Sequence, residues 1–125
     1  MWMVAKVQDT EVLRGVLDGW KAGVDARQPQ RVAAVFTEDA IFQGLRPYSV
    51  GRDGVANYYD SQPLGMTATY RILETRRPTE DLVLGYVRAD FTFPARATVS
   101  LNLGVLIMRT DTDWCILHYQ ASPAG

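Results

Sequence analysis

Residues 97–121, ATVSLNLGVLIMRTDTDWCILHYQA, decide the fold, because they hold the longest apolar alternation in the sequence and its only histidine, His118. Apolar residues that recur at every second position are typical of β-strands. We therefore expect two long antiparallel strands joined by a tight turn near residues 111–113. The elements that precede this hairpin are expected to wrap it into a half-open cone.

The register of the hairpin decides which side chains share the concave face, because a slip of one residue exchanges the two faces of a strand. Alternate residues from Val99 to Ile107 are all apolar and are assigned to the concave face. A two-residue turn at 111–112 pairs His118 with Val105. A turn at 112–113 keeps the same facing, and a three-residue turn reverses it. We take a two-residue turn, which points Trp114, Ile116, His118 and Gln120 inward.

The residues before the hairpin predict helices first and strands afterwards. Apolar spacing and an opening proline predict helices at 9–24, from Pro29, and at 54–60. Period-two patterns predict strands at 40–42, 66–77 and 82–93. This order predicts a single α+β domain over residues 1–125, with three N-terminal helices on the concave face of a cone-shaped, curved antiparallel sheet.

Composition excludes several classes of function. An apolar content of 47% and a net charge of -1, without runs of like charge, are typical of a globular domain that binds neither nucleic acid nor an acidic membrane. A single cysteine and a single histidine cannot build a disulfide or a zinc site, so we expect no metal and no cofactor. The first residues do not resemble a signal peptide and no stretch is long enough to cross a membrane, so a cytoplasmic location is expected.

Polar residues on the strand 82–93 are the candidates for chemistry. Tyr86, Arg88 and Asp90 share one of its faces. If that face is concave, Arg88 and Asp90 converge with His118 in an apolar cavity, where Asp90 or His118 would be the catalytic acid and base. Arg88 would then bind an acidic or carbonyl group. The alternative, which the sequence leaves open, places Arg88 and Asp90 on the outer face as solvated or dimer-contact charges.

Aromatic and amide side chains are candidates for the cavity wall. Trp20 ends the apolar stripe of the first helix, Tyr59 lies in the third helix, and Tyr48 lies on a loop that would border the mouth of the cone. Gln120 is the next inward residue after His118. We therefore expect Trp20, Tyr48, Tyr59, Arg88 and Gln120 to contact a ligand, although for each aromatic residue an ordinary core position is the alternative.

Three segments carry a resemblance to a known superfamily: WKAGVDARQPQRVAAVFTEDAIF (20–42), VGRDGVANYY (50–59) and MRTDTDWCILHYQAS (108–122). They resemble the nuclear transport factor 2-like superfamily, and within it the SnoaL-like branch and the association domain of calcium/calmodulin-dependent protein kinase II. The resemblance covers nearly the whole chain. It implies the fold more than the function, because this superfamily includes enzymes, carriers and oligomerisation domains.

The resemblance also implies roles for individual residues. Arg88, in the strand LGYVRADF, and His118, four residues after Trp114, match positions that line the pocket of the association domain. A second histidine of that pocket is Gln120 here. In the isomerases, dehydratases and cyclases of the superfamily, a pocket aspartate or histidine transfers protons, and Asp90 is the only carboxylate on a core strand that matches this role.

Two functions follow as alternatives. The first is a cofactor-free isomerase, dehydratase or cyclase that acts on a small apolar, cyclic or aromatic metabolite. The second is a non-catalytic ligand-binding or association domain. Either one is expected to form a homodimer through the sheet, because an apolar outer face would otherwise be left in water. The residues assigned to this outer face are Leu106, Met108, Cys115, Leu117 and Tyr119.

Overall fold

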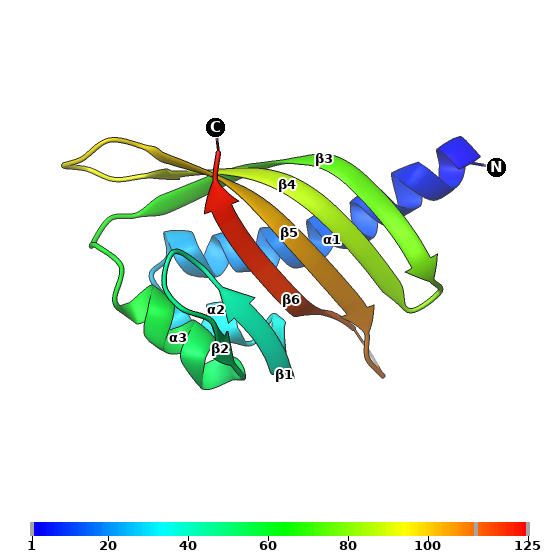
Figure 1. The fold of residues 1–125 in the computed structure, drawn as a ribbon, viewed down its shortest axis with the longest axis horizontal. Coiled ribbons are helices and arrows are strands. Elements are labelled where there is room, and N and C mark those ends of the chain that lie inside the picture. Colours follow the sequence, from blue (N-terminus) through cyan, green and yellow to red (C-terminus); the bar gives the residue numbers. More distant parts are fainter. Residues whose placement is uncertain (1, 112, 125) are drawn as a thin grey trace.

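The computed structural model describes residues 2–111 and 113–124. Its elements in chain order are α1 (Trp2–Asp25), α2 (Pro29–Ala33), β1 (Phe36–Gln43), β2 (Ser49–Val50), α3 (Arg52–Asp60), β3 (Thr67–Thr79), β4 (Leu82–Thr92), β5 (Val99–Arg109) and β6 (Trp114–Pro123). The architecture is α+β with a curved sheet, which confirms the predicted fold class (Figure 1). None of the helices in this described part is long and apolar enough to span a membrane.

The sheet has six strands in the order β2-β1-β6-β5-β4-β3. Strands β3 to β6 form the predicted antiparallel meander. β1 departs from the prediction, because it pairs in parallel with β6 and antiparallel with β2, so the sheet is mixed rather than wholly antiparallel. The chain between β1 and β6 contains α3 and four strands, β2 to β5, and a long crossover of this kind is what a parallel pair requires.

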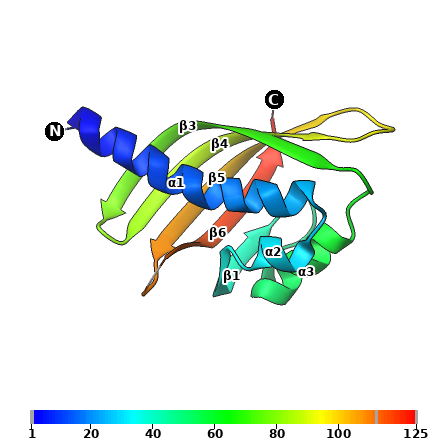
Figure 2. The ribbon, with the colours of Figure 1, turned by 180° about the vertical axis from the view of Figure 1, so that it is seen from behind.

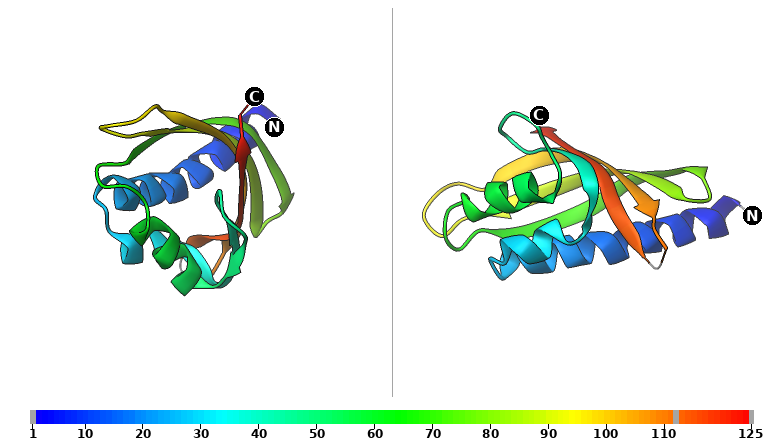
Figure 3. Two further views of the ribbon diagram at one scale, coloured as in Figure 1. Left: turned by 60° about the vertical axis from the view of Figure 1, so that its left-hand side comes forward. Right: turned by 90° about the horizontal axis from the view of Figure 1, so that it is seen from below.

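α1 runs across the concave face of the sheet, while α2 and α3 lie together at one end, beside β1 (Figures 2 and 3). α1 packs chiefly against β3. Its close approach to β4 occurs at Gly85, where a Cβ atom would lie 2.3 Å from Leu13 Cδ2. Leu13 is fully buried. The missing side chain of Gly85 therefore leaves the space that Leu13 fills.

Side chains of α1 also cover the free edge of β3. Lys6 Nζ donates a hydrogen bond to the carbonyl of Thr75 at 2.9 Å. Lys21 Nζ donates a hydrogen bond of 2.6 Å to the carbonyl of Ala68. Asp25 Oδ1 accepts a hydrogen bond of 2.8 Å from the amide of the same residue. Because unpaired groups at a sheet edge invite other strands to pair with them, α1 protects this edge from that pairing.

A partly buried ion pair and a tryptophan close the end of the sheet that lies away from α3. Asp9 is 5% exposed and accepts a hydrogen bond from Arg77 Nη1 at 2.8 Å. The guanidinium groups of Arg77 and Arg109 lie 5.5 and 5.2 Å from the ring centroid of Trp114. Trp114 packs against the core from this end. These contacts leave the opposite end, near α3, as the mouth of the fold.

A β-bulge in β6 interrupts the register of the central hairpin. Trp114 pairs with Arg109 and Ile116 with Ile107, the pairing expected for a two-residue turn. Residue 112, which belongs to that predicted turn, lies outside the described residues. The register then shifts, and His118 pairs with Leu106 instead of Val105. Leu117 is the extra residue that the bulge inserts.

Because side chains alternate with a period of two, the bulge places every residue that follows it on the face opposite to the predicted one. Tyr119 pairs with Val105 and is 1% exposed, so it points into the core although it was assigned to the outer face. His118 and Gln120 lie on the outer face although inward positions were expected. Trp114 and Ile116 precede the bulge and face inward as predicted.

The contact between Gly85 and Leu13 can be tested by a single methyl group. Gly85→Ala is expected to lower the free energy of unfolding by about 1–3 kcal/mol, because the new Cβ overlaps a side chain that has no room to move. Gly15→Ala on α1 is the matched control. Its Cβ meets nothing within 4 Å, so this change is expected to stabilise the helix by up to about 1 kcal/mol. Urea denaturation measures both, and equal values for the two variants would contradict the packing of α1 on β4.

Candidate functional site

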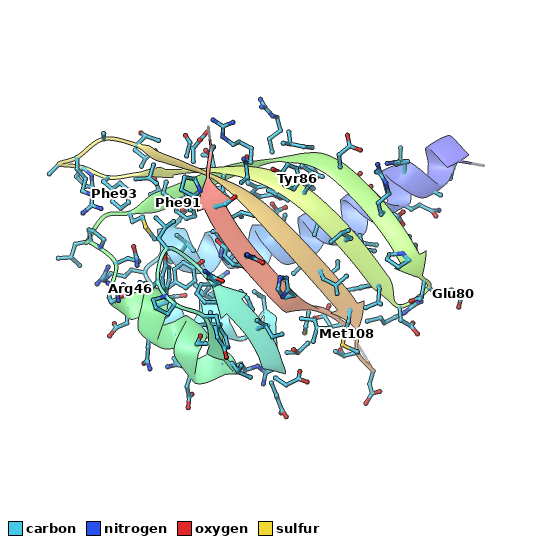
Figure 4. All side chains as sticks on the ribbon, viewed as in Figure 1. Arg46, Glu80, Tyr86, Phe91, Phe93 and Met108 are labelled. Atoms are coloured by element: carbon cyan, nitrogen blue, oxygen red, sulfur yellow. The ribbon has the colours of Figure 1, made fainter. Side chains whose placement is uncertain are left out.

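A small aromatic cavity opens at the mouth of the fold. Its volume is about 50 Å³. Most of its wall consists of aromatic and aliphatic side chains from α3, β4, β5 and β6. The lining residues are Leu45, Tyr58, Tyr59, Gln62, Met66, Phe91, Phe93, Arg96, Val99, Leu101 and Tyr119. Phe91 and Phe93 lie at the end of β4 where the β4–β5 connection projects, opposite the end that carries Met108 and Glu80 (Figure 4).

Two tyrosine hydroxyls lie in the deep part of the cavity. The indole Nε1–H of Trp20 donates a hydrogen bond of 3.0 Å to the hydroxyl oxygen of Tyr59. The hydroxyls of Tyr59 and Tyr119 interact with each other. Both rings pack in an aromatic cluster around Phe42, whose ring stacks on Tyr119 with a centroid distance of 4.9 Å. Both phenol rings are therefore packed against other aromatic rings.

The rim of the cavity is more polar. The hydroxyl of Tyr58 accepts a hydrogen bond of 3.1 Å from the amide of Leu45, and Gln62 Nε2 donates to the carbonyl of Tyr58 at 3.2 Å. Arg96, on the exposed β4–β5 connection, lies with its guanidinium 4.7 Å from the ring centroid of Phe93. Leu45 and Arg96 are both exposed, so the cavity reaches the surface between them.

The cavity disfavours negative charge. Burial raises the pKa of Tyr59 above that of an ordinary phenol, and this effect exceeds the lowering caused by its hydrogen bonds to Tyr119 and Trp20. Burial likewise raises the pKa of Tyr119, with a further contribution from Tyr59 beside it. Both groups are therefore neutral donors near pH 7 and are poorly suited to act as bases.

Only part of the predicted cavity wall is found in it. Tyr59 lines the cavity as expected. Trp20 is fully buried and does not line the cavity, but its indole donates a hydrogen bond to Tyr59, which does. Tyr48 is 67% exposed and is not among the lining residues, because the connection between β1 and β2 turns it to solvent. The loop was placed correctly near the mouth, but Leu45 is its residue that lines the cavity.

Arg88 and Asp90 lie on the outer face of the sheet, which was the alternative left open by the sequence. Arg88 pairs with Asn102 and Asp90 with Ser100, while the intervening Ala89 is fully buried. Asp90 Oδ1 accepts a hydrogen bond of 2.6 Å from Ser100 Oγ. It lies 3.8 Å from Arg88 Nε, which is shielded from water and has no hydrogen-bond partner in the described part of the chain.

None of the residues predicted for acid–base chemistry lines the aromatic cavity. Asp90 and Arg88 contribute to a shallow outer pocket with Thr69, Tyr70 and Arg71. His118 and Gln120 lie on the outer face of β6, as the bulge requires. Arg88, Asp90 and His118 therefore do not converge inside the cone, and the outer-face alternative is the one found for Arg88 and Asp90.

Sequence reasoning missed most of the lining residues. Phe91 and Phe93 alternate with polar residues and follow buried Val87 and Ala89, so their inward facing was visible in the pattern. Tyr119 was not visible, because no signal in the sequence marked the bulge before it. No group of three or more His, Cys, Asp or Glu side chains that could hold a metal ion occurs within residues 2–111 and 113–124.

Comparison with solved structures identifies the fold. No protein-family model matches the sequence, and no curated protein matches it. A ketosteroid isomerase-like protein from Erwinia carotovora atroseptica is 20% identical, with a TM-score of 0.78 over 92% of this chain and 95% of that one. A candidate calcium/calmodulin-dependent protein kinase type II association domain from Thiobacillus denitrificans is 18% identical, with a TM-score of 0.77 over 90% and 94%. An NTF-2-like protein of unknown function from Shewanella oneidensis is 16% identical, with a TM-score of 0.78 over 90% and 98%.

The raised pKa values predict how stability depends on alkaline pH. Tyr59 and Tyr119 stay protonated in the folded chain but ionise near pH 10 when unfolded, so their contribution to stability is constant below about pH 10 and is lost above it. Each phenol should lower the free energy of unfolding by about 1.4 kcal/mol per pH unit in that range.

Urea denaturation between about pH 9 and pH 11 measures this decline. Tyr59→Phe and Tyr119→Phe should each reduce the slope of this decline by the contribution of one ionising phenol, about 1.4 kcal/mol per pH unit. Tyr48→Phe is the matched control, because it removes a phenol that is 67% exposed. A decline that is as steep in Tyr119→Phe as in the wild type would show that this phenol is not buried in the folded chain.

Proposed function

We propose that this nuclear transport factor 2-like chain is a non-catalytic association domain that forms a homodimer through the outer face of its sheet. The observation that carries the proposal is the apolar surface on that face. Ile41, Leu84 and Tyr86 are 44%, 43% and 46% exposed there. Side chains of this size are unfavourable in water when they form a continuous patch.

The strand registers make the patch continuous. One row across the sheet consists of Leu84, Leu106, His118 and Ile41, on β4, β5, β6 and β1. The next row consists of Leu82, Met108 and Cys115. We call these residues, together with Tyr86, the outer patch. Adjacent strands lie about 4.8 Å apart, so the side chains of each row touch. The helices of the described chain lie on the opposite face (Figure 2).

Charge favours a second copy of the chain as the partner. Arg88 and Asp90 lie beside the outer patch, and their charges have opposite signs. A twofold axis brings the same surface of two copies together, so a surface that carries both signs can pair with itself. The formal net charge of -1 adds little repulsion between copies. Arg88 Nε, which has no hydrogen-bond partner among the described residues, gains one if a second copy supplies an acceptor.

The side chains that line the cavity disfavour the alternative function, an isomerase, dehydratase or cyclase. Such enzymes need a group that exchanges protons near neutral pH. No carboxylate or imidazole is among the described residues that line the cavity. Its volume of about 50 Å³ is also well below the roughly 300–1,000 Å³ of typical sites for drug-sized ligands. An association domain among the similar folds is compatible with the proposal, although at 18% identity it supports the fold alone.

Light scattering at micromolar concentration tests the proposal. The native protein should have about twice its chain mass of 14.0 kDa. Leu106→Glu, in the middle of the outer patch, should reduce the mass to that of one chain, because two carboxylates would be buried without partners.

Leu64→Glu is the matched control. Leu64 is 74% exposed and belongs to the segment between α3 and β3, away from the outer patch, so this variant should remain dimeric. A native protein that is monomeric, or a Leu106→Glu variant that stays dimeric while folded, would refute association through this face.

A further inference from the structure

We propose that the outer face of the sheet carries a binding site for a small 2-hydroxycarboxylate anion, and that the bound anion strengthens self-association. The site is the outer pocket that contains Arg71, Arg88 and Asp90. Binding of the anion is independent of the proposed function, whereas its effect on association rests on that function.

The strand register places two arginines side by side in the outer pocket. Arg71 on β3 pairs directly with Arg88 on β4, so both side chains leave the same face of the sheet. Side chains of directly paired residues begin about 5 Å apart, and like charges in this arrangement repel each other. No hydrogen bond or ion pair joins Arg71 to another residue of the described chain. The two arginines therefore lack an anion between them.

Asp90 does not supply this anion, although it is the only carboxylate among the described residues of the pocket. Its Oδ1 accepts a hydrogen bond of 2.6 Å from Ser100 Oγ. The same oxygen lies 3.8 Å from Arg88 Nε, which is too far for a hydrogen bond. The hydroxyl of Thr69, also in the pocket, both donates and accepts and leaves the balance unchanged. The pocket therefore keeps an excess of N–H donors and of positive charge.

A carboxylate is the group that this excess favours. A guanidinium group binds a carboxylate through two parallel N–H···O hydrogen bonds, so one carboxylate between Arg71 and Arg88 can accept from both. With two guanidinium groups and one carboxylate in the wall, the excess amounts to one positive charge. This excess matches a monoanion. Phosphate is disfavoured, because Asp90 would repel its second charge.

The free oxygen of Asp90 favours a hydroxyl group beside the ligand's carboxylate. Asp90 Oδ2 accepts no hydrogen bond from a residue of the described chain. A neighbouring hydroxyl can donate to it, whereas an ammonium group would bring a further positive charge towards the two arginines. The pocket has a volume of about 430 Å³, which leaves room for an acid of a few carbon atoms.

The position of the pocket connects anion binding with self-association. Arg88 is the next outward residue on β4 after Tyr86, which belongs to the outer patch (Figure 4). A second copy on the outer patch therefore borders the pocket, and a twofold axis brings the excess positive charge of both copies to one interface. A bound anion cancels this excess on each copy. Because linkage is reciprocal, anion binding and association should strengthen each other.

Four compounds test the site: lactate, propionate without the hydroxyl group, methyl lactate without the charge, and inorganic phosphate with a second charge. Binding is followed by the ¹H–¹⁵N NMR signals of the arginine Nε groups at pH 7 and constant ionic strength. Lactate should bind about tenfold more tightly than propionate, as one net hydrogen bond provides. Methyl lactate should not bind, and phosphate should bind more weakly than lactate.

Three variants assign the binding to the outer pocket. Arg71→Gln should abolish lactate binding, and it removes a side chain without hydrogen-bond or ion-pair partners in the described chain, so it should stay folded. Arg31→Gln is the matched control, because it removes the same charge from an exposed position on α2 and should bind lactate as the wild type does. Asp90→Asn should remove the preference for lactate over propionate, since an amide that donates replaces the accepting oxygen.

The site is overturned if the wild type does not bind lactate, if it binds propionate or methyl lactate equally well, or if Arg71→Gln binds lactate like the wild type. A folded Asp90→Asn variant that keeps the tenfold preference would overturn the role of Asp90. If this variant does not fold, the ranking of the compounds in the wild type and in Arg71→Gln decides.

Light scattering over a range of protein concentrations tests the coupling. Saturating lactate should lower the dissociation constant of the wild-type dimer about tenfold, and it should leave that of Arg71→Gln unchanged. A wild-type dimer that lactate does not strengthen overturns the coupling but leaves the proposed function intact. A wild type that is monomeric with and without lactate refutes the proposed function and the coupling, while the NMR ranking still decides on the site.

Discussion

The structure depends on one inserted residue, Leu117, in the last strand. The bulge at Leu117 lets Ile116 face the core before it and Tyr119 face the core after it, with His118 between them on the outer face. Tyr119 then completes the aromatic cluster with Phe42 and Tyr59, which fills the space beneath α3. Without the insertion, an imidazole would occupy the inward position and a phenol would lie on the outer face.

This insertion separates the two surfaces on which function can be based. The concave side receives three tyrosines and apolar side chains, so it becomes an aromatic cavity with neutral donors. The outer face receives the imidazole, the Arg88–Asp90 pair and the outer patch. The charged or titratable side chains of Arg88, Asp90 and His118 therefore lie where a second copy of the chain would cover them. The hydroxyls of Tyr59 and Tyr119 inside the cavity do not exchange protons near neutral pH.

The fold could be read from the sequence because its determinants are local and repeated. The strands of the meander and the stripe from Leu13 to Trp20 each have several residues in phase, so one irregularity does not hide them. The parallel pairing of β1 with β6 could not be read, since it joins segments that are far apart in the chain. The site could not be predicted for a related reason. The insertion at Leu117 reverses the faces on which His118 and Tyr119 lie, but it leaves the alternation of apolar and polar residues in the sequence unchanged. Arg88 and Asp90 were ambiguous because both faces of β4 contain apolar residues, among them Tyr86 outside and Val87 inside.

The bulge can be measured directly because the chain has a single histidine, whose ring protons give resolved NMR signals without competition from other imidazoles. Nuclear Overhauser contacts from this ring report which side of β6 it lies on. The account predicts contacts to the methyl groups of Ile41 and Leu106, its partners on β1 and β5. Contacts to Val105 or to the ring of Trp20 would place His118 in the core and contradict the account.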